Sequence, residues 1–144
     1  MPKIRHIAIM TLNPDKLADF YEKVFDMKVL HRGTEPGGAV FMTDGYFNIA
    51  ILPNKGQDTP SGINHFGFHV EDKEEIARRI KEFGLAEPTK RPSTRPYAEH
   101  RATDPDGNLF DLSEHGFQDV ETDADRAAKG SKGSKSRTRE KVDA

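Results

Sequence analysis

Two stretches of the chain have nearly the same pattern, and each carries a histidine at the same place. Residues 4–10 read Ile-Arg-His-Ile-Ala-Ile-Met, and residues 63–69 read Ile-Asn-His-Phe-Gly-Phe-His. Each is followed by a helical pattern, and the two patterns end alike, at residues 24–26 and 82–84. Self-similarity of this length indicates one supersecondary unit that occurs twice. The repeat therefore limits the fold to a duplicated arrangement with a histidine-bearing strand in each half.

The first unit is predicted to be a strand, a helix and three further strands. Alternating residues predict the first strand over 3–10. Asn13-Pro14 is typical of a helix start, with a capping side chain before a proline at the first helical position. Short strands are expected at 28–32, 39–43 and 47–52, the last two joined by the hairpin signal Asp44-Gly45. The apolar stripe of the helix is expected to pack on the sheet; it consists of Leu17, Phe20, Tyr21, Val24 and Phe25.

The second unit repeats this order after a linker at 53–62. A strand is expected at 63–70, and Asp72 is expected to cap a helix with a buried stripe of Ile76, Ile80 and Phe83, which Gly84 ends. Residues 86–96 have little pattern, and strands are expected at 97–102 and 108–114. The fold class is therefore α+β: two βαβββ units, about residues 3–52 and 63–115, with curved mixed sheets around a cleft.

Composition sets the outer limits. The 144 residues suit one compact domain, which we place at residues 1–117, with a disordered charged tail at 118–144 that is rich in Gly, Ser and Lys. A net charge of −2 argues against a nucleic-acid partner. The absence of cysteine excludes disulfides and thiolate sites. No stretch approaches the ~20 apolar residues of a membrane span and no signal peptide is evident, so we expect a cytoplasmic protein with no membrane partner.

Three side chains are candidate metal ligands. Strand alternation places His6 on the sheet face that the helix leaves open, and the repeat places His65 in the same cleft. Asp111 stands between Phe110 and Leu112 on the last strand, where a cation would offset the cost of burying a carboxylate. Two imidazoles and one carboxylate leave coordination positions open, as in non-haem Fe(II) enzymes. The alternative is that each histidine is an ordinary strand residue and that Asp111 is a surface carboxylate or pairs with Arg101.

Basic residues before and within the seventh strand are candidate substrate contacts. Arg101 is expected either to bind a substrate carboxylate or phosphate in the cleft or to pair with Glu99 or Asp111. Lys90 and Arg91 are interpreted as an exposed basic loop. Tyr97 is either a core aromatic residue or a substrate contact.

The pattern resembles the vicinal oxygen chelate superfamily, which includes glyoxalase I, bleomycin-resistance proteins and extradiol dioxygenases. The resemblance is carried by Ile4–Met10, Leu17–Met27, Asn64–Asp72 and residues 104–108 leading to Asp111, and it covers about residues 3–115. It implies metal ligands at His6, His65 and Asp111, although family members with this arrangement usually have Glu at the last position. In glyoxalase I proteins a Glu of the fourth strand is a further ligand and the proton-transfer base. Here the inward candidates are Asn48 and Ala50, so Glu99 or His100 would have to serve as the base.

These features predict a divalent-metal enzyme that acts on a small-molecule substrate through two adjacent oxygens. Our first prediction is an Fe(II)-type dioxygenase, with Fe(II) or Mn(II) favoured and Zn(II) or Ni(II) as alternatives. The alternative functions are a glyoxalase-like lyase or isomerase that uses the same metal, and a metal-free binding protein of the bleomycin-resistance type. The single-module relatives imply a homodimer, with metal ligands drawn from one chain or from both.

Overall fold

The computed structural model describes residues 1–56, 58–92, 98–116 and 123–132. Tyr97 lies outside these residues. The elements up to β8 follow the predicted order of strand, helix and three strands in each unit, and one further helix comes after them. The bounds are β1 (Lys3–Thr11), α1 (Pro14–Phe25), β2 (Lys28–Arg32), β3 (Val40–Thr43), β4 (Asn48–Pro53), β5 (Gly62–His69), α2 (Lys73–Glu82), β6 (Thr89–Lys90), β7 (His100–Thr103), β8 (Leu109–Ser113) and α3 (Asp123–Lys132).

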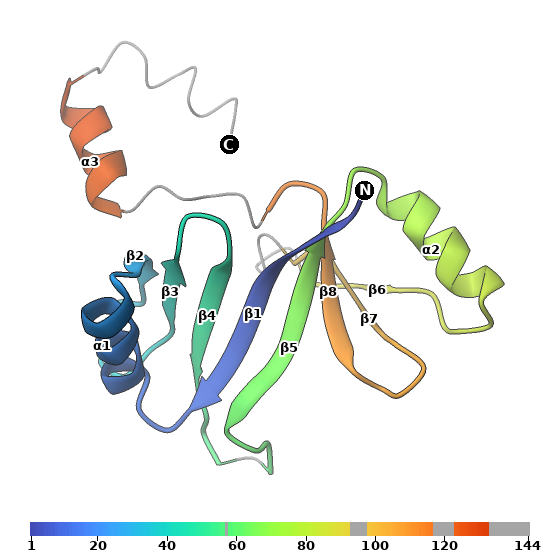
Figure 1. The fold of residues 1–144 in the computed structure, drawn as a ribbon, viewed down its shortest axis with the longest axis horizontal. Coiled ribbons are helices and arrows are strands. Elements are labelled where there is room, and N and C mark those ends of the chain that lie inside the picture. The colour runs from blue at the N-terminus through green and yellow to red at the C-terminus, as the bar shows by residue number, and fades with distance from the viewer. Residues whose placement is uncertain (57, 93–97, 117–122, 133–144) are drawn as a thin grey trace.

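The two units lie side by side and share one curved sheet (Figure 1). The strand order is β2-β3-β4-β1-β5-β8-β7-β6, so each unit contributes one half of the sheet. Within the halves β1 pairs parallel with β4 and β5 pairs parallel with β8, and the antiparallel pair β1–β5 joins them. The α+β class with two βαβββ units is confirmed. The two units form one continuous curved sheet rather than two separate sheets.

The helix boundaries follow from the capping residues that the sequence predicts. Asn13 Oδ1 accepts a hydrogen bond from the Lys16 backbone N–H at 3.1 Å, and Pro14 is the first helical residue of α1. Asp72 caps α2 by accepting from two backbone N–H groups of its first turn. Gly84 follows α2 with φ +98°, a left-handed conformation that glycine adopts without a steric penalty.

The core of the first half lies between α1 and the strands β2, β3 and β4. Its buried members are Ala18, Met27, Val40, Met42 and Ile51. The prediction that the whole apolar stripe of α1 packs on the sheet is wrong, because the helix approaches the sheet through the small side chain of Ala18. Phe20, Val24 and Phe25 are at least half exposed as a result.

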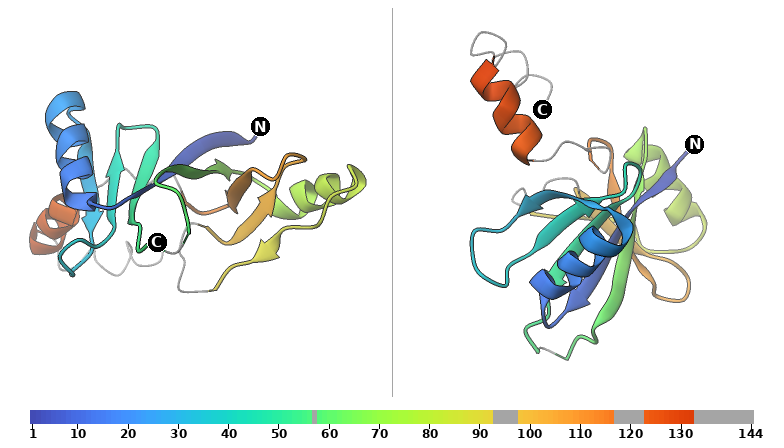
Figure 2. Two further views of the ribbon diagram at one scale, coloured as in Figure 1. Left: turned by 90° about the horizontal axis from the view of Figure 1, so that it is seen from below. Right: turned by 60° about the vertical axis from the view of Figure 1, so that its left-hand side comes forward.

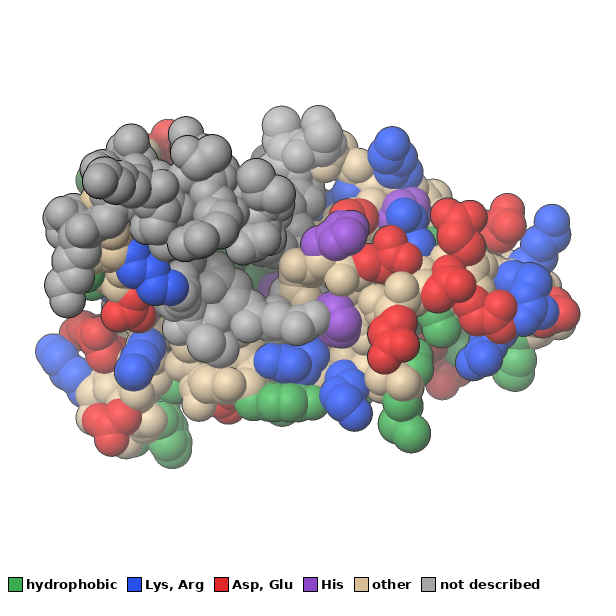
Figure 3. All heavy atoms as spheres, turned by 90° about the horizontal axis from the view of Figure 1, so that it is seen from above, with side chains coloured by type: hydrophobic (Ala, Val, Ile, Leu, Met, Phe, Trp, Pro, Cys, Tyr) green, Lys and Arg blue, Asp and Glu red, His purple; other side chains and the backbone are tan. Residues whose placement is uncertain are grey.

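The prediction of a buried stripe on α2 is also wrong. No residue of α2 is buried, and Phe83 at its C-terminal end is 74% exposed. Arg78 instead pairs with Glu82 at 2.8 Å, and Arg79 pairs with Glu75 at 3.0 Å along the helix surface. Charged side chains of both signs therefore cover this end of the molecule (Figure 3).

One helix lies within the segment that was expected to lack structure. α3 stands near β2, at the edge of the first half (Figure 2). Three alanines, among the strongest helix formers, favour it: Ala124, Ala127 and Ala128. The rest of 118–144 lies outside the described residues, so its disorder stays a prediction. Among the described helices, none has the length and apolar composition that crossing a membrane requires.

Candidate metal centre

The three predicted ligands stand on the central strands, on one face of the sheet. Ile49 and Ile51 of β4 pack toward the core under α1, so Asn48, which lies between the turn and Ile49 on the same strand, faces the opposite side of the sheet. His6 of β1 pairs with Asn48 and therefore faces that side too. Across the next pairs, Gly67 of β5 lies opposite His6 on one side and opposite Asp111 on the other. Gly67 itself contributes no side chain between His6 and Asp111. Asp111 is only 1% exposed.

The side chains of the triad (His6, His65 and Asp111) converge. One ligand atom of each lies within 4.8 Å of the other two. His65 Nε2 is 3.1 Å from Asp111 Oδ2, and His6 Nε2 is 4.0 Å from the same oxygen. Two atoms bound at right angles to one ion, each about 2.1 Å from it, are about 3.0 Å apart. His65 and Asp111 already have this spacing, and the distance from His6 Nε2 to Asp111 Oδ2 exceeds it by about 1 Å. The residues present therefore fit a divalent ion, and their role as ligands remains a prediction.

The neighbour of His65 determines which of its nitrogens faces the triad. Asn64 Oδ1 lies 2.7 Å from His65 Nδ1, and an amide oxygen can only accept, so Nδ1 carries the proton. In the neutral ring Nε2 then has its lone pair directed at a carboxylate oxygen 3.1 Å away. Two acceptors at this distance repel each other unless a proton or a metal ion lies between them. A metal ion would resolve this contact and would use the ligand orientation that Asn64 imposes.

Sequence reasoning did not identify Asn64, because adjacent residues of a regular strand point to opposite faces. The β1–β5 pairing shifts between Ala8 and Ile9, which pair with His65 and Ile63, so that Asn64 is the extra residue of a β-bulge. Bulges of this kind re-aim side chains next to functional sites. The bulge is what allows two consecutive side chains to contact each other here.

His6 is held in its neutral form. Burial and the nearby imidazole of His65 lower its pKa from 6.5 to about 4, although Asp111 and a hydrogen bond to the backbone of Asn48 act in the opposite direction. Neutral imidazole is the form that binds a metal ion. The Asn48 side chain stands next to His6, and its Oδ1 is buried with no hydrogen-bond partner among the described residues. The fourth strand thus brings an amide, and no carboxylate, to the site.

Asp111 is held in its charged form. Burial alone would raise its pKa, but hydrogen bonds with His65 and Arg101 outweigh burial and lower the pKa to about 2. Arg101 Nε donates to Asp111 Oδ1 at 2.7 Å, and Arg101 Nη2 lies 3.4 Å both from Asp111 Oδ2 and from His65 Nε2. Of the two predicted roles of Arg101, the structure thus shows the pairing with Asp111.

Arg91 also reaches the triad, which corrects the interpretation of residues 90 and 91 as an exposed loop. Arg91 Nη1 lies 3.8 Å from Asp111 Oδ1, and its side chain is only 16% exposed. β6 pairs with β7 so that Thr89 faces Arg101, and the Arg91 backbone N–H donates to the Glu99 carbonyl at 2.8 Å. Alternation from Thr89 then places Arg91 on the face of the triad. A strand of two residues is too short for its alternation to predict the direction of the Arg91 side chain from the sequence.

The two candidate bases lie in different surroundings. Glu99 precedes β7, and its Oε1 accepts from the Glu114 backbone N–H at 3.0 Å. Its Oε2 is buried without a hydrogen-bond partner among the described residues. A catalytic role of Glu99 stays a prediction. His100 pairs with Leu112, whose parity is opposite to that of Asp111, and so it faces away from the triad. The expectation that it could act as the base there is wrong.

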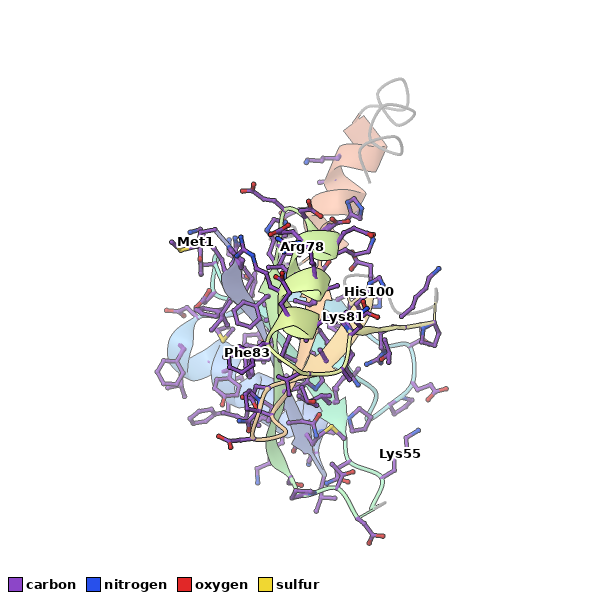
Figure 4. All side chains as sticks on the ribbon, turned by 90° about the vertical axis from the view of Figure 1, so that its right-hand side faces the viewer. Met1, Lys55, Arg78, Lys81, Phe83 and His100 are labelled. Atoms are coloured by element: carbon purple, nitrogen blue, oxygen red, sulfur yellow. The ribbon has the colours of Figure 1, made fainter. Side chains whose placement is uncertain are left out.

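The side chain of His100 instead faces α2 (Figure 4). It contributes to a cavity of about 220 Å³ between α2 and the sheet, on the side away from the triad. The other lining residues are Lys73, Glu74, Ala77, Glu87, Pro88 and Leu112.

Comparisons with known proteins agree with this architecture. A sequence model described as the Glyoxalase/Bleomycin resistance protein/Dioxygenase superfamily matches residues 3–112. A Bacillus subtilis (strain 168) protein named "Probable trivalent organoarsenical cleaving enzyme" is 31% identical over 118 residues, which are 76% of this chain and 78% of that protein.

Two solved structures show the same fold. The 2,3-dioxygenase LapB from Pseudomonas sp. KL28 has a TM-score of 0.60 at 23% identity, and the match covers 77% of this chain and 40% of that one. A Streptomyces coelicolor methylmalonyl-CoA epimerase has a TM-score of 0.53 at 20% identity, with 76% and 92% covered. At these identities the likeness extends to the fold alone.

Proposed function

The chain belongs to the glyoxalase/bleomycin resistance protein/dioxygenase superfamily, and on that premise we propose that it is a divalent-metal-dependent enzyme. In this proposal His6, His65 and Asp111 hold the ion, and the substrate is a small molecule that binds through two adjacent oxygens. The reaction is Fe(II)-type dioxygenation. The observation that carries the proposal is the convergence of two imidazoles and one carboxylate within 4.8 Å on one face of the sheet.

The bound ion would hold and polarise the two substrate oxygens. The chain's own residues prepare the site for it. Asn64 turns Nε2 of His65 toward the triad, and Arg101 keeps Asp111 ionised. Burial keeps His6 neutral. Two imidazoles and a carboxylate suit Fe(II) or Mn(II), and Zn(II) or Ni(II) would also bind such a set.

The arsenic substrate of the Bacillus subtilis relative is not carried over to this chain. Trivalent arsenic is a soft centre, for which a thiolate is the suitable protein ligand. The chain has no cysteine, so it offers no thiolate. We therefore propose a metal-dependent reaction for this chain but not an organoarsenical substrate.

A lyase or isomerase that uses the same metal is the second candidate, because a methylmalonyl-CoA epimerase shares the fold. Such a reaction moves a proton and needs a base within reach of the substrate. Asn48 cannot act as that base, which leaves Glu99. A metal-free binding protein is the weakest candidate, since it gives no reason for three buried ligand atoms to converge.

Metal reconstitution tests the proposal. The wild-type protein is loaded with Mn(II) without oxygen, desalted and analysed for metal, beside His65→Ala and a control, His31→Ala, on the outermost strand β2. We expect one ion per chain in the wild type and the control and a large loss in His65→Ala. Equal metal content in all three would exclude His65 as a ligand. Oxygen uptake then separates the candidate reactions, because turnover without oxygen consumption rules out a dioxygenase.

The assembly and location stay part of the proposal. All three candidate ligands come from one chain, so a dimer is not needed to complete the triad. A homodimer remains our expectation, because the sheet face between α1 and α2 is open in Figures 1 and 2 and Ile63 on β5 is 75% exposed. We also retain a cytoplasmic location.

A further inference from the structure

We propose that Arg91 and Arg101 form a binding position for a carboxylate of the substrate, next to the triad. This inference rests on the proposed function, since it takes the triad as the place where the substrate's two adjacent oxygens bind. It adds the chemical class of the substrate: a small molecule that carries a carboxylate besides its chelating oxygens.

Both guanidinium groups approach the same oxygen atom. Arg101 Nε donates to Asp111 Oδ1 at 2.7 Å, and Arg91 Nη1 lies 3.8 Å from that oxygen. The two nitrogens are therefore at most about 6.5 Å apart, the sum of the two distances. Two guanidinium groups this close, beside one carboxylate, can together enclose a second one, because each has a planar fork of donors that matches a carboxylate.

The charges at the site favour an anionic ligand. With neutral histidines, the formal charges of Arg91, Arg101, Asp111 and Glu99 cancel, and a divalent ion would bring the total to +2. Glu99 is itself held by the Glu114 backbone N–H. Positive charge in a partly buried position is unfavourable unless an anion accompanies it. A carboxylate on the substrate supplies that anion.

The two arginines are also more accessible than the carboxylate they share. The exposed fractions of the Arg91 and Arg101 side chains are 16% and 25%, against 2% for Asp111. Arg101 Nη1 has no hydrogen-bond partner among the described residues, while its Nε and Nη2 contact Asp111. Arg101 Nη1 therefore remains as a donor for an incoming ligand.

Calorimetric titration with matched ligands tests the inference. The protein is loaded with Mn(II), its metal content is measured, and it is titrated with 3,4-dihydroxybenzoate and 3,4-dihydroxyphenylacetate and with the amide of each. Each pair differs only in the charge of one group. The variants are Arg91→Gln and a matched control, Lys90→Gln, which removes the same charge from the neighbouring exposed residue.

We expect the wild type to bind at least one carboxylate about 10-fold more tightly than its amide, a difference of about 1.4 kcal/mol. Arg91→Gln should bring this ratio close to one, and Lys90→Gln should leave it unchanged. Equal affinities for acid and amide in the wild type, or an unchanged ratio in Arg91→Gln, would overturn the inference. If the wild type takes up no Mn(II), the proposed function fails. The acid-to-amide affinity ratio is then measured on the metal-free protein, where both arginines are still present, and that ratio tests the inference separately from the proposed function.

Discussion

Replacing Asp111 by asparagine removes one buried negative charge and keeps the size of the side chain. The wild-type carboxyl has a pKa of about 2 in the folded protein, against an ordinary value of 3.8 for an aspartate. This difference of about 1.8 units, at 1.36 kcal/mol per unit, is about 2 kcal/mol of charge-dependent stability. We therefore expect Asp111→Asn to lower the free energy of unfolding of the metal-free protein by about 2 kcal/mol at pH 7.

The sign of the pH dependence follows from the lowered pKa. The contribution of Asp111 is fully present above the unfolded-state pKa and is lost as pH falls through the folded-state pKa. The gap between wild type and Asp111→Asn should thus stay constant from pH 7 to pH 5, fall to roughly half at pH 3 and nearly vanish below pH 2. Urea unfolding with a chelator present, at several pH values, measures it. A gap that does not change with pH would refute the reasoning.

Two further substitutions test other parts of the structure. Asn64→Leu removes the acceptor of the His65 Nδ1–H, so we expect Mn(II) affinity to fall by about 10- to 100-fold, while Asn64→Asp should retain most of it. Competition with a chelator of known affinity measures both, and full affinity in Asn64→Leu would contradict the proposed orientation of His65. Met42→Ala leaves a cavity in the core under α1, where Met42 is 0% exposed, so urea unfolding should show a loss of about 2–5 kcal/mol. A loss below 1 kcal/mol would mean that the core collapses around the shortened side chain.

The positions of His6, His65 and Asp111 could be predicted because strand alternation and the repeat act over many residues. Each histidine has the same place in its unit, and the parity of a strand decides which face its side chains take. The pairing of β1 with β5 and of β5 with β8 then brings these residues together.

The positions of Asn64 and Arg91 could not be predicted, because they depend on local departures from that regularity. Asn64 reaches His65 only because a bulge inserts one residue into β5. Arg91 reaches Asp111 through the pairing of a two-residue strand. The burial of Phe20 and Phe83 was overestimated for a related reason: an apolar stripe shows which face a helix turns inward, but not how much of that face the sheet is wide enough to cover.

The seam between β1 and β5 joins the two halves of the sheet, and it also carries His6 on one side and His65 on the other. Neither half alone holds more than one of these histidines on its first strand. An ion bound by both histidines would therefore connect the two halves across this pair of strands. Binding of the ion and association of the two halves would then be thermodynamically coupled. Whatever loosens that junction should make the protein release its ion before it unfolds.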